Sequence, residues 1–488
     1  MRAISFALLL GAMPLLAQQP MPLTEKIDVS AVNVDVTVLD RQRNPVRGLT
    51  AADFEVFEDG VAQRITNFYA VENGGIARTT AVEPDAERFR RKVLVIVDNT
   101  ALCAKPRRNL LLNKLESFID QHFSGDYEWA IVPLGGPQSP GALPFTQDKE
   151  TIHNAIEALR RDEALPRDMD FGEISRTTQS ACRILQEQSF LSQLLNKQVR
   201  MKGAAISAAV EEMCDGLAAA PGKKVILLVT DAIPSGSFRA DLPDDAILIQ
   251  KMHEAVVRSA NAANVNVFVM NTEGLTDGGT PGRPFTLAAD ESGGFWLATE
   301  TGGRYLHSSS FSESLQTFEN ATANFYSLGY IMRHAEDAKY HRISVRLKGP
   351  GSYALSYRLG FSSRSTEQQL ERALRTPLGI ATQRSTLPLT MEVGAPSQVG
   401  AKVVVALTAM LPAERVQAGR LDLYVTVFDQ TGRKLGFHHF RRDIETIETP
   451  QLVLTTRLTF PHGSYRLVMT LRDEETNEIG IASSDATF

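Results

Sequence analysis

RKVLVIVDNTAL, residues 91–102, is the stretch that decides the fold. Its five successive apolar residues, Val93 to Val97, predict a strand buried on both faces, as the central strand of a parallel sheet requires. Asp98 follows this run directly. We therefore expect its carboxylate at the carboxyl end of the strand, where open α/β sheets bind their ligands.

A second run repeats this pattern later in the chain. In KKVILLVTDA, residues 223–232, the apolar residues Val225 to Val229 lead into Thr230 and Asp231. Parallel strands of one sheet end at the same edge, so Asp98 and Asp231 are expected near each other. Two carboxylates at one sheet edge indicate a metal or cation site.

Between and after these runs, strand patterns alternate with helix patterns. Strands are predicted at Tyr127 to Leu134 and Val265 to Met270, and helices at Leu111 to Ile119, Lys149 to Arg160, Gly203 to Leu217, Ala246 to Ala262 and Ser310 to Phe325. This alternation predicts an α/β fold with a doubly wound, mostly parallel sheet covered by helices on both faces. We assign it to residues 90–335, with a β-hairpin extension of the same domain at residues 336–361.

A small N-terminal β module is expected at residues 27–72. Valines occupy every second position from Val32 to Val38, which is the period of a strand, and turns with further strands follow. Glu55, Glu58 and Asp59 lie in a predicted turn region. We interpret these three acidic residues as solvated turn residues rather than as ligands.

The C-terminal part of the sequence is dominated by strand patterns. Residues 362–386 are expected to be a polar linker with a short helix, and residues 387–488 an antiparallel β-sandwich with hairpin turns. His438 and His439 are adjacent. Because neighbouring residues of a strand face opposite sides, they make a poor metal-binding pair.

The two aspartate-bearing runs resemble the von Willebrand factor A domain, whose adhesion site joins an Asp-x-Ser-x-Ser loop, a distant threonine and a later aspartate. The resemblance covers roughly Arg90 to Gly360 and implies a Rossmann-like fold. Further segments are similar to the secreted von Willebrand A-related proteins of acidobacteria: GLTAADFEVFEDG (48–60), TGGRYLH (301–307), NFYSLGYIM (324–332), HRISVRLKG (341–349) and YALSYRLGF (353–361). In that family a divalent ion takes its last ligand from an acidic residue of the bound partner.

On this resemblance, Asp98, Thr100 and Asp231 are the candidate metal ligands, for Mg²⁺ or another divalent cation. Leu102 stands where the second serine is expected, and Gly203-Ala204-Ala205 lacks the threonine hydroxyl, for which Ser207 is a candidate substitute. The site is therefore degenerate, because Mg²⁺ demands nearly octahedral oxygen coordination. The alternative is a retained fold in which the two aspartates only cap backbone amides.

The start of the chain and its charge predict where the protein works. Residues 1–17, MRAISFALLLGAMPLLA, combine one arginine, a short apolar run and a terminal small residue, the pattern of a secretory signal peptide. No later stretch reaches the ~20 apolar residues that a membrane span needs. The net charge of -6 and the lack of a long Lys/Arg run argue against nucleic-acid binding. We expect an exported protein, periplasmic or extracellular, without a transmembrane segment.

Export favours disulfides, and the chain has three cysteines. Cys182 and Cys214 flank a segment that is broken near Gly203, and an antiparallel hairpin would bring them together, so a bridge between them is favoured. Cys103 would then be left over; it could instead pair with Cys182, or stay a buried small apolar residue.

Known enzyme signatures are missing from the sequence. His253-Glu254 begins a zincin-like pattern, but Val257 stands where the second histidine ligand belongs. There is no Gly-x-Ser-x-Gly elbow, no phosphate loop and no dinucleotide fingerprint after a strand. We therefore expect a non-enzymatic protein.

The prediction is an exported, adhesion-type binding protein that recognises a protein or cell-surface ligand at the sheet edge around Asp98, Thr100 and Asp231. The charged insertion of residues 161–202 reaches the same edge and is either a specificity element or a surface embellishment. One alternative is a structural or assembly component of the cell envelope whose central domain is a metal-free scaffold. A weaker alternative is a metal-dependent hydrolase that uses the same aspartates.

Overall fold

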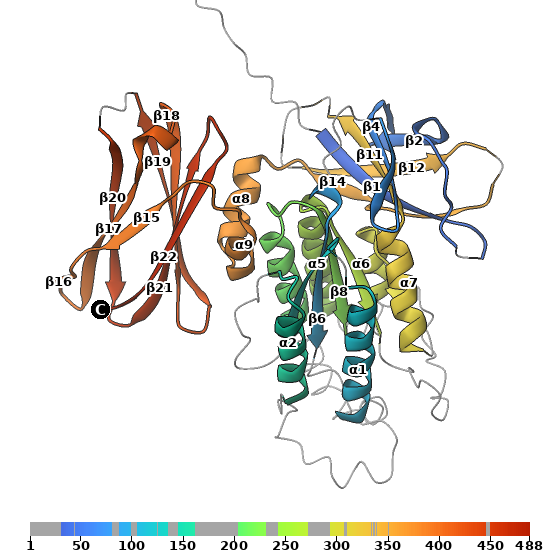
Figure 1. Cartoon of the computed structure of the whole chain (residues 1–488), viewed down its shortest axis with the longest axis horizontal. Helices are drawn as coiled ribbons and strands as arrows, with labels where there is room; N and C mark the ends of the chain where they lie inside the picture. Colours follow the sequence, from blue (N-terminus) through green and yellow to red (C-terminus); the bar gives the residue numbers. More distant parts are fainter. Residues whose placement is uncertain are drawn as a thin grey trace, which may run out of the picture.

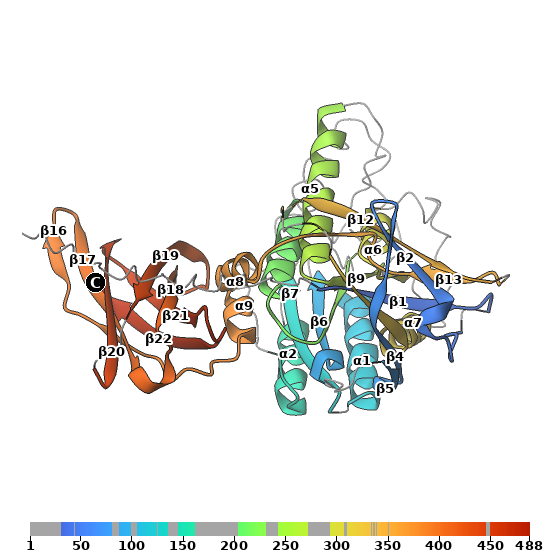
Figure 2. The ribbon, with the colours of Figure 1, turned by 90° about the horizontal axis from the view of Figure 1, so that it is seen from above.

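The structure of the 488-residue chain is a computed structural model. It describes residues 31–42, 44–80, 87–98, 105–123, 125–134, 145–161, 204–230, 243–271, 293–306, 310–332, 334, 337, 339–349, 351–445 and 449–488. Three parts are visible in Figures 1 and 2: a C-terminal sandwich, a central region with a parallel sheet, and a β unit next to that sheet. Two short helices lie between the C-terminal sandwich and the central region.

The central sheet is five-stranded and parallel, in the order β10-β9-β8-β6-β7. Its strands are β6 (Arg91–Asp98), β7 (Tyr127–Leu134), β8 (Lys223–Val229), β9 (Val265–Met270) and β10 (Tyr305–Leu306). Val95 pairs with Ile131 on one side and with Leu227 on the other. Every residue of β6 and β8 is buried, as the apolar runs in both sequences predict.

Helices cover both faces of this sheet, because successive residues of a buried strand point to opposite sides. Val93, Val95 and Val97 share a core with α1 (Lys105–Gln121), α2 (Lys149–Arg161) and α7 (Phe311–Ala323). Leu94 and Ile96 share the opposite core with the helical run 204–216, α5 (Pro243–Ala262) and α6 (Gly293–Glu300). We call residues 91–323 the parallel domain.

A second unit is built from two segments that are far apart in the sequence, residues 31–79 and 325–362, and is called here the split β unit. One sheet has the order β13-β1-β11-β4-β5 and the other β14-β12-β2-β3, and both share one core. The strands are β1 (Ala31–Leu39), β2 (Phe54–Glu58), β3 (Val61–Gln63), β4 (Ile65–Glu72), β5 (Gly75–Thr79), β11 (Phe325–Ile331), β12 (Tyr340–Leu347), β13 (Ala354–Ser356) and β14 (Gly360–Ser362), with single-turn helices η1 (Ala51–Asp53) and η2 (Glu87–Phe89).

This pairing divides the region differently from the sequence-based division at residues 27–72, 90–335 and 336–361. β11 does not join the parallel sheet; it lies between β1 and β4, with Leu328 opposite both Val34 and Phe68. β12 pairs with β2 rather than extending the parallel domain. The parallel domain is thus inserted into the split β unit, because β1 and β11 lie too far apart in sequence for local patterns to indicate their contact.

The predicted fold class, an α/β protein on a doubly wound and mostly parallel sheet, is wrong for this chain. Of the five sheets in the part of the chain that the structure describes, four are antiparallel, and strand dominates the assigned secondary structure. The error has a physical cause. Fully buried parallel strands give conspicuous apolar runs, whereas antiparallel strands with one buried face give weaker, alternating patterns such as that of β1.

The C-terminal sandwich consists of two four-stranded antiparallel sheets around one core. The strands are β15 (Thr390–Val393), β16 (Ser397–Val399), β17 (Lys402–Pro412), β18 (Gly419–Phe428), β19 (Lys434–Ile444), β20 (Gln451–Pro461), β21 (Ser464–Asp473) and β22 (Ile479–Thr487), with the single-turn helix η5 (Ala413–Arg415). The alternating burial along β17 shows why its sequence predicts a strand with one face on a core.

The segment expected to be a linker folds into α8 (Thr366–Leu374) and α9 (Pro377–Thr382), which connect the two larger parts. Leu370 and Leu374 of α8 pack on Tyr424 of the sandwich, while Leu378 of α9 enters the core of the parallel domain. Gly216 permits this contact, since a Cβ there would lie 2.7 Å from the Thr376 hydroxyl. None of the helices in the described ranges is both long and apolar enough to cross a membrane.

Candidate functional site

Asp98 lies at the carboxyl end of β6, an inner strand of the parallel sheet. Its side chain is 1% exposed, and the Thr230 hydroxyl donates a 2.9 Å hydrogen bond to Asp98 Oδ2. Thr230 follows β8 directly, and its amide donates to the carbonyl of Met270 at the end of β9. A buried carboxylate is costly without hydrogen bonds, so this contact explains how Asp98 can remain inside the protein.

The order of the parallel strands reverses between β6 and β8. The chain proceeds from β6 outward to β7, and then returns to place β8 on the other side of β6. In open parallel sheets, ligands bind outside the carboxyl ends of the strands at such a reversal point. Asp98 and Thr230 occupy this position, as the sequence predicts for the end of the two apolar runs.

The structure describes only part of the predicted cation site. Thr100, Asp231 and Gly203 lie outside the described residues, so the ligand set Asp98, Thr100 and Asp231 stays a prediction. Ser207 is nine-tenths buried in the run 204–216. The described donors, one carboxylate and one hydroxyl bound to each other, are too few for the six oxygen ligands that Mg²⁺ takes.

A shallow hollow of about 210 Å³ lies between the helical run 204–216 and α5. It is lined by small, apolar and charged side chains: Ala204, Ser207, Ala208, Glu211, Lys251, Met252 and Ala255. Burial, and then the neighbouring Asp215 carboxylate, raise the pKa of Glu211 at its rim.

The opposite end of the parallel sheet is closed by buried charges. Lys223, the first residue of β8, forms a 2.7 Å ion pair with Asp35 of β1. Arg91, the first residue of β6, pairs with Glu319 of α7 at 3.2 Å and lies over the ring of Tyr127. Burial acts against ionisation of Asp35, yet Lys223 holds the pKa of Asp35 below its usual value.

Further contacts fasten this amino end to the split β unit. Arg358 donates from one guanidinium nitrogen to the Asn33 carbonyl of β1 at 2.7 Å, and from the other to the Asn261 carbonyl of α5. Lys224, next to Lys223, is buried, and its burial, followed by the charge of Arg358, lowers its pKa to about 7. The split β unit therefore covers the amino ends of β6 and β8.

The cysteine prediction is corrected at Cys214. Cys214 carries a free thiol, and its side chain is fully buried in the core beneath the run 204–216. Burial raises the pKa of this thiol. The bridge from Cys182 to Cys214 is thus not formed, because Cys214 faces the sheet; Cys182 and Cys103 lie outside the described residues.

Two histidine–carboxylate clusters were missed by the sequence analysis. One joins Glu58, His334 and His341 in the split β unit, and the other joins Glu367, Glu371 and His439 at α8. The interpretation of Glu58 as a solvated turn residue is wrong, since it is only 4% exposed. Both clusters unite residues from distant parts of the chain, so no local spacing indicates them.

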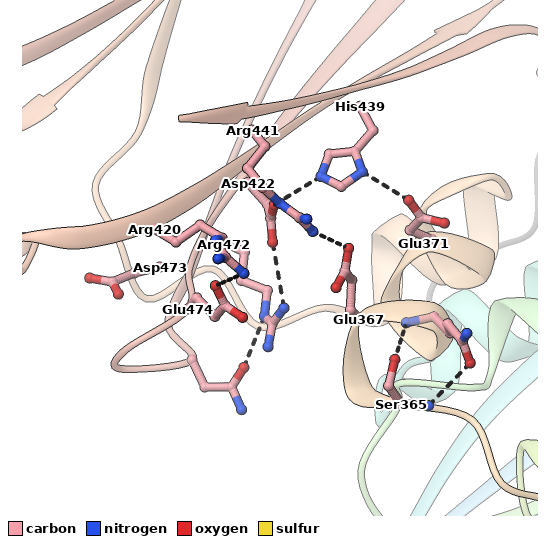
Figure 3. A network of polar contacts seen from close by, with 12 residues as sticks. Ser365, Glu367, Glu371, Arg420, Asp422, His439, Arg441, Arg472, Asp473 and Glu474 are labelled. Carbon is pink, nitrogen blue, oxygen red and sulfur yellow. Dashed lines mark hydrogen bonds and ion pairs between the residues drawn. The ribbon is translucent and has the colours of Figure 1, made fainter. Parts of the chain in front are cut away.

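Figure 3 shows the second cluster as part of a polar network between α8 and the C-terminal sandwich. Asp422 of β18 is fully buried and pairs with His439 at 2.9 Å, with Arg441 at 3.1 Å and with Arg472 at 3.6 Å. Glu371 of α8 pairs with the other nitrogen of His439, and Glu367 pairs with Arg441. Two guanidinium groups thus already balance these carboxylates, and the network fastens α8 to the sandwich.

No family model matches the chain, and no curated protein matches it. Among solved structures, the pilus adhesin SpaC from Lactobacillus rhamnosus GG aligns with a TM-score of 0.23 and 10% identity over 91% of this chain and 61% of that one. A CARDB domain from Pyrococcus furiosus aligns with a TM-score of 0.15 and 15% identity over 22% of this chain and 91% of that domain.

A third similarity is to β-glucuronidase 2 from Bacteroides uniformis. The TM-score is 0.17 and the identity 15%, over 21% of this chain. The aligned part spans only 13% of the glucuronidase. Non-enzymatic function therefore stays a prediction from the sequence.

Proposed function

We propose that this protein is an exported binding protein that holds a protein or cell-surface ligand at the carboxyl edge of the parallel sheet. The observation that carries the proposal is the buried pair of Asp98 and Thr230 at the point where the strand order reverses. The two side chains join the ends of β6 and β8 at the edge where open α/β sheets bind their ligands.

The arrangement of the neighbouring unit supports this choice of edge. The amino ends of β6 and β8 face the split β unit, to which Lys223 and Arg358 bind. Figure 1 shows β6 pointing away from that unit. The carboxyl edge is thus the end of the sheet that the split β unit leaves uncovered.

Because Asp98 is so deeply buried, its role is that of a positioning residue. The hydrogen bond from Thr230 ties the end of β6 to the end of β8, and the segments after both strands leave from this tie. Binding residues concentrate on loops that a rigid scaffold positions. Loss of the tie is therefore expected to change ligand binding while the parallel sheet itself persists.

The test is binding of the labelled full chain to intact cells of the producing organism, measured by flow cytometry. We expect Asp98→Ala to reduce saturable binding at least tenfold. The matched control is Asp120→Ala, which removes a carboxylate near the end of α1, where the side chain is 41% exposed. Circular dichroism of both variants establishes that they are folded; equal binding by both folded variants contradicts the proposal.

A structural role in the cell envelope is the second candidate, and the α8–α9 junction favours it. Asp215 of the run 204–216 forms a 2.8 Å ion pair with Arg372 of α8, and Leu378 is fully buried in the core of the parallel domain. An α8–α9 junction fixed by these contacts suits a protein that acts as a rigid spacer, with binding surfaces on the parallel domain and on the C-terminal sandwich. If Asp98→Ala leaves cell binding intact while removal of residues 387–488 abolishes it, this second candidate is the better account.

A further inference from the structure

The cluster of Glu58, His334 and His341 belongs to the split β unit, outside the parallel sheet. Glu58 ends β2, at the Asp59-Gly60 turn that leads into β3. His334 lies in the connection from β11 to β12, and His341 is the second residue of β12. The three ligand atoms all lie within 4.8 Å of one another.

The carboxylate of Glu58 is only half satisfied. Its Oε1 lies 2.5 Å from His334 Nε2 and 3.7 Å from His341 Nδ1. Its Oε2 is buried and makes no hydrogen bond of normal length to a described residue, and the same holds for the buried Tyr330 hydroxyl beside it. A buried carboxylate oxygen without a donor is destabilising, which indicates that a positively charged group is missing from this place.

His341 Nδ1 lies 2.8 Å from Asp59 Oδ2 and 3.7 Å from Glu58 Oε1, and its other nitrogen faces a further carboxylate. Its Nε2 lies 3.1 Å from Asp337 Oδ1, and Asp337 in turn accepts hydrogen bonds from the Ser363 hydroxyl and the Lys339 amide. A histidine whose outer nitrogen is bound by a carboxylate is the usual arrangement of a metal-ligating imidazole.

We propose that Glu58, His334 and His341 bind a divalent transition-metal ion of the Zn²⁺ type. Two histidines and one glutamate form a known three-residue ligand set for tetrahedral zinc, with a fourth position left open. Asp59, whose Oδ2 lies 2.8 Å from His341 Nδ1, or a water molecule completes the coordination.

The distances fit with a small adjustment. Zinc bonds of about 2.0–2.1 Å place tetrahedral ligand atoms about 3.3 Å apart. His341 Nδ1 is 3.7 Å from Glu58 Oε1, close to that value, whereas His334 Nε2 must retreat from its 2.5 Å hydrogen bond. His334 can do so because its side chain is 35% exposed and lies between strands. The ion replaces the proton that these two groups share, so binding releases protons.

The cluster at α8 provides the internal comparison. There the buried Asp422 carboxylate pairs with two guanidinium groups, Arg441 and Arg472, in addition to His439. In the described chain, the ion pairs of Glu58 are with histidines alone. The carboxylates of the α8 cluster therefore already pair with two guanidinium cations, whereas the ion pairs of Glu58 involve only histidines, which makes the Glu58 cluster the better candidate for a metal ion.

The ion would fasten the turn after β2 to the connection between β11 and β12. β2 and β12 pair in one sheet and β11 belongs to the other, and the segments that carry them are separated by the whole parallel domain in sequence. Because the unfolded chain holds no such site, an ion bound only to the folded state raises its stability.

The test uses calorimetry with Zn²⁺ and the full chain after dialysis against chelator, together with the visible spectrum of the Co²⁺ form. We expect one ion bound by these three residues and intense tetrahedral cobalt bands. His334→Ala should abolish both signals without loss of folding, since the residue is partly exposed between strands. Asp337→Ala should weaken affinity about 10–100-fold through loss of the orienting carboxylate.

The matched control is His439→Ala, which removes a histidine from the α8 cluster and should leave the zinc stoichiometry unchanged. Circular dichroism of the metal-free variants shows whether each is folded. The proposal is overturned if the wild-type chain binds no Zn²⁺ at micromolar concentrations at pH 7.5. It is also overturned if a folded His334→Ala variant keeps the wild-type affinity, or if His439→Ala is the variant that loses the ion.

Discussion

The two ends of the parallel sheet are built differently, although charged or polar residues mark both. At the amino end, Lys223 and Arg91 pair with carboxylates of other elements, at 2.7 and 3.2 Å. At the carboxyl end, the buried Asp98 receives a hydrogen bond from the neutral hydroxyl of Thr230. The Lys223–Asp35 ion pair at the amino end joins the parallel domain to the split β unit, whereas the Asp98–Thr230 hydrogen bond at the carboxyl end ties together the ends of β6 and β8.

The largest effect is expected at the amino end, where Asp35→Ala leaves Lys223 buried without its carboxylate. Removing one partner of a buried ion pair costs about 3–5 kcal/mol. We expect that loss in the free energy of unfolding, measured by urea denaturation with tyrosine and tryptophan fluorescence. The double variant Asp35→Leu, Lys223→Met should recover much of the lost free energy of unfolding. If Asp35→Ala is as stable as the wild type, the buried ion pair does not stabilise the amino end, and the proposed difference between the two ends is wrong.

Lys224 should make the amino end sensitive to pH. Its pKa is lowered to about 7 from an ordinary 10.5, so between these values the folded protein binds fewer protons than the unfolded chain. Stability contributed by this residue therefore rises with pH across that window, by at most about 1.4 kcal/mol per pH unit. The unfolding free energy of the wild type and of Lys224→Met can be measured from pH 6.5 to 10. The difference between the two proteins should shrink as the pH rises. A constant difference would contradict the low pKa.

At the carboxyl end, Thr230→Val removes the hydroxyl but keeps the shape of the side chain. Asp98 then loses one donor, at a cost of about 1–3 kcal/mol. We expect a lower midpoint of thermal unfolding together with weaker cell binding. Thr408→Val, at a partly exposed position of β17, should change stability by no more than about 0.5 kcal/mol, and a similar loss in both variants would remove the special role of Thr230.

The smallest effect is expected for Asp120→Ala on the surface of α1. Asp120 pairs with Lys149 and His153 at 3.2 Å, but all three side chains are at least a third exposed. Exposed ion pairs contribute about 0–1 kcal/mol. Unfolding and cell binding should both stay near the wild-type values, and a large change would mean that surface charge, rather than the sheet edge, governs binding.

Local sequence patterns predicted the elements of the parallel domain well. The strands Tyr127–Leu134 and Val265–Met270 have the predicted bounds, and α2 extends one residue beyond its predicted end at Arg160. The position of Asp98 at the end of a buried strand also followed from the pattern. These features depend on residues that are neighbours in the chain, and hydrophobic periodicity reports such neighbours.

Predictions about long-range contacts failed because hydrophobic periodicity does not report contacts between residues that are far apart in the chain. β11 was assigned to the parallel domain, yet it pairs with β1, almost three hundred positions earlier in the chain. Glu58 was interpreted as solvated because its turn sequence is polar, but β12 and the connection before it cover its side chain. Cys214 was placed in a hairpin, whereas its helix turns it into the core.

By itself, the sequence determined where buried strands begin and end and which carboxylate follows a buried inner strand of the parallel sheet, because side-chain burial repeats with the period of each element. The tertiary structure alone decided that β11 closes the split β unit, that Lys223 meets Asp35, and that Glu58 joins two histidines. Each of these contacts joins segments separated by most of a domain. Their partners are chosen by the packing of whole sheets, which no local pattern of residues records.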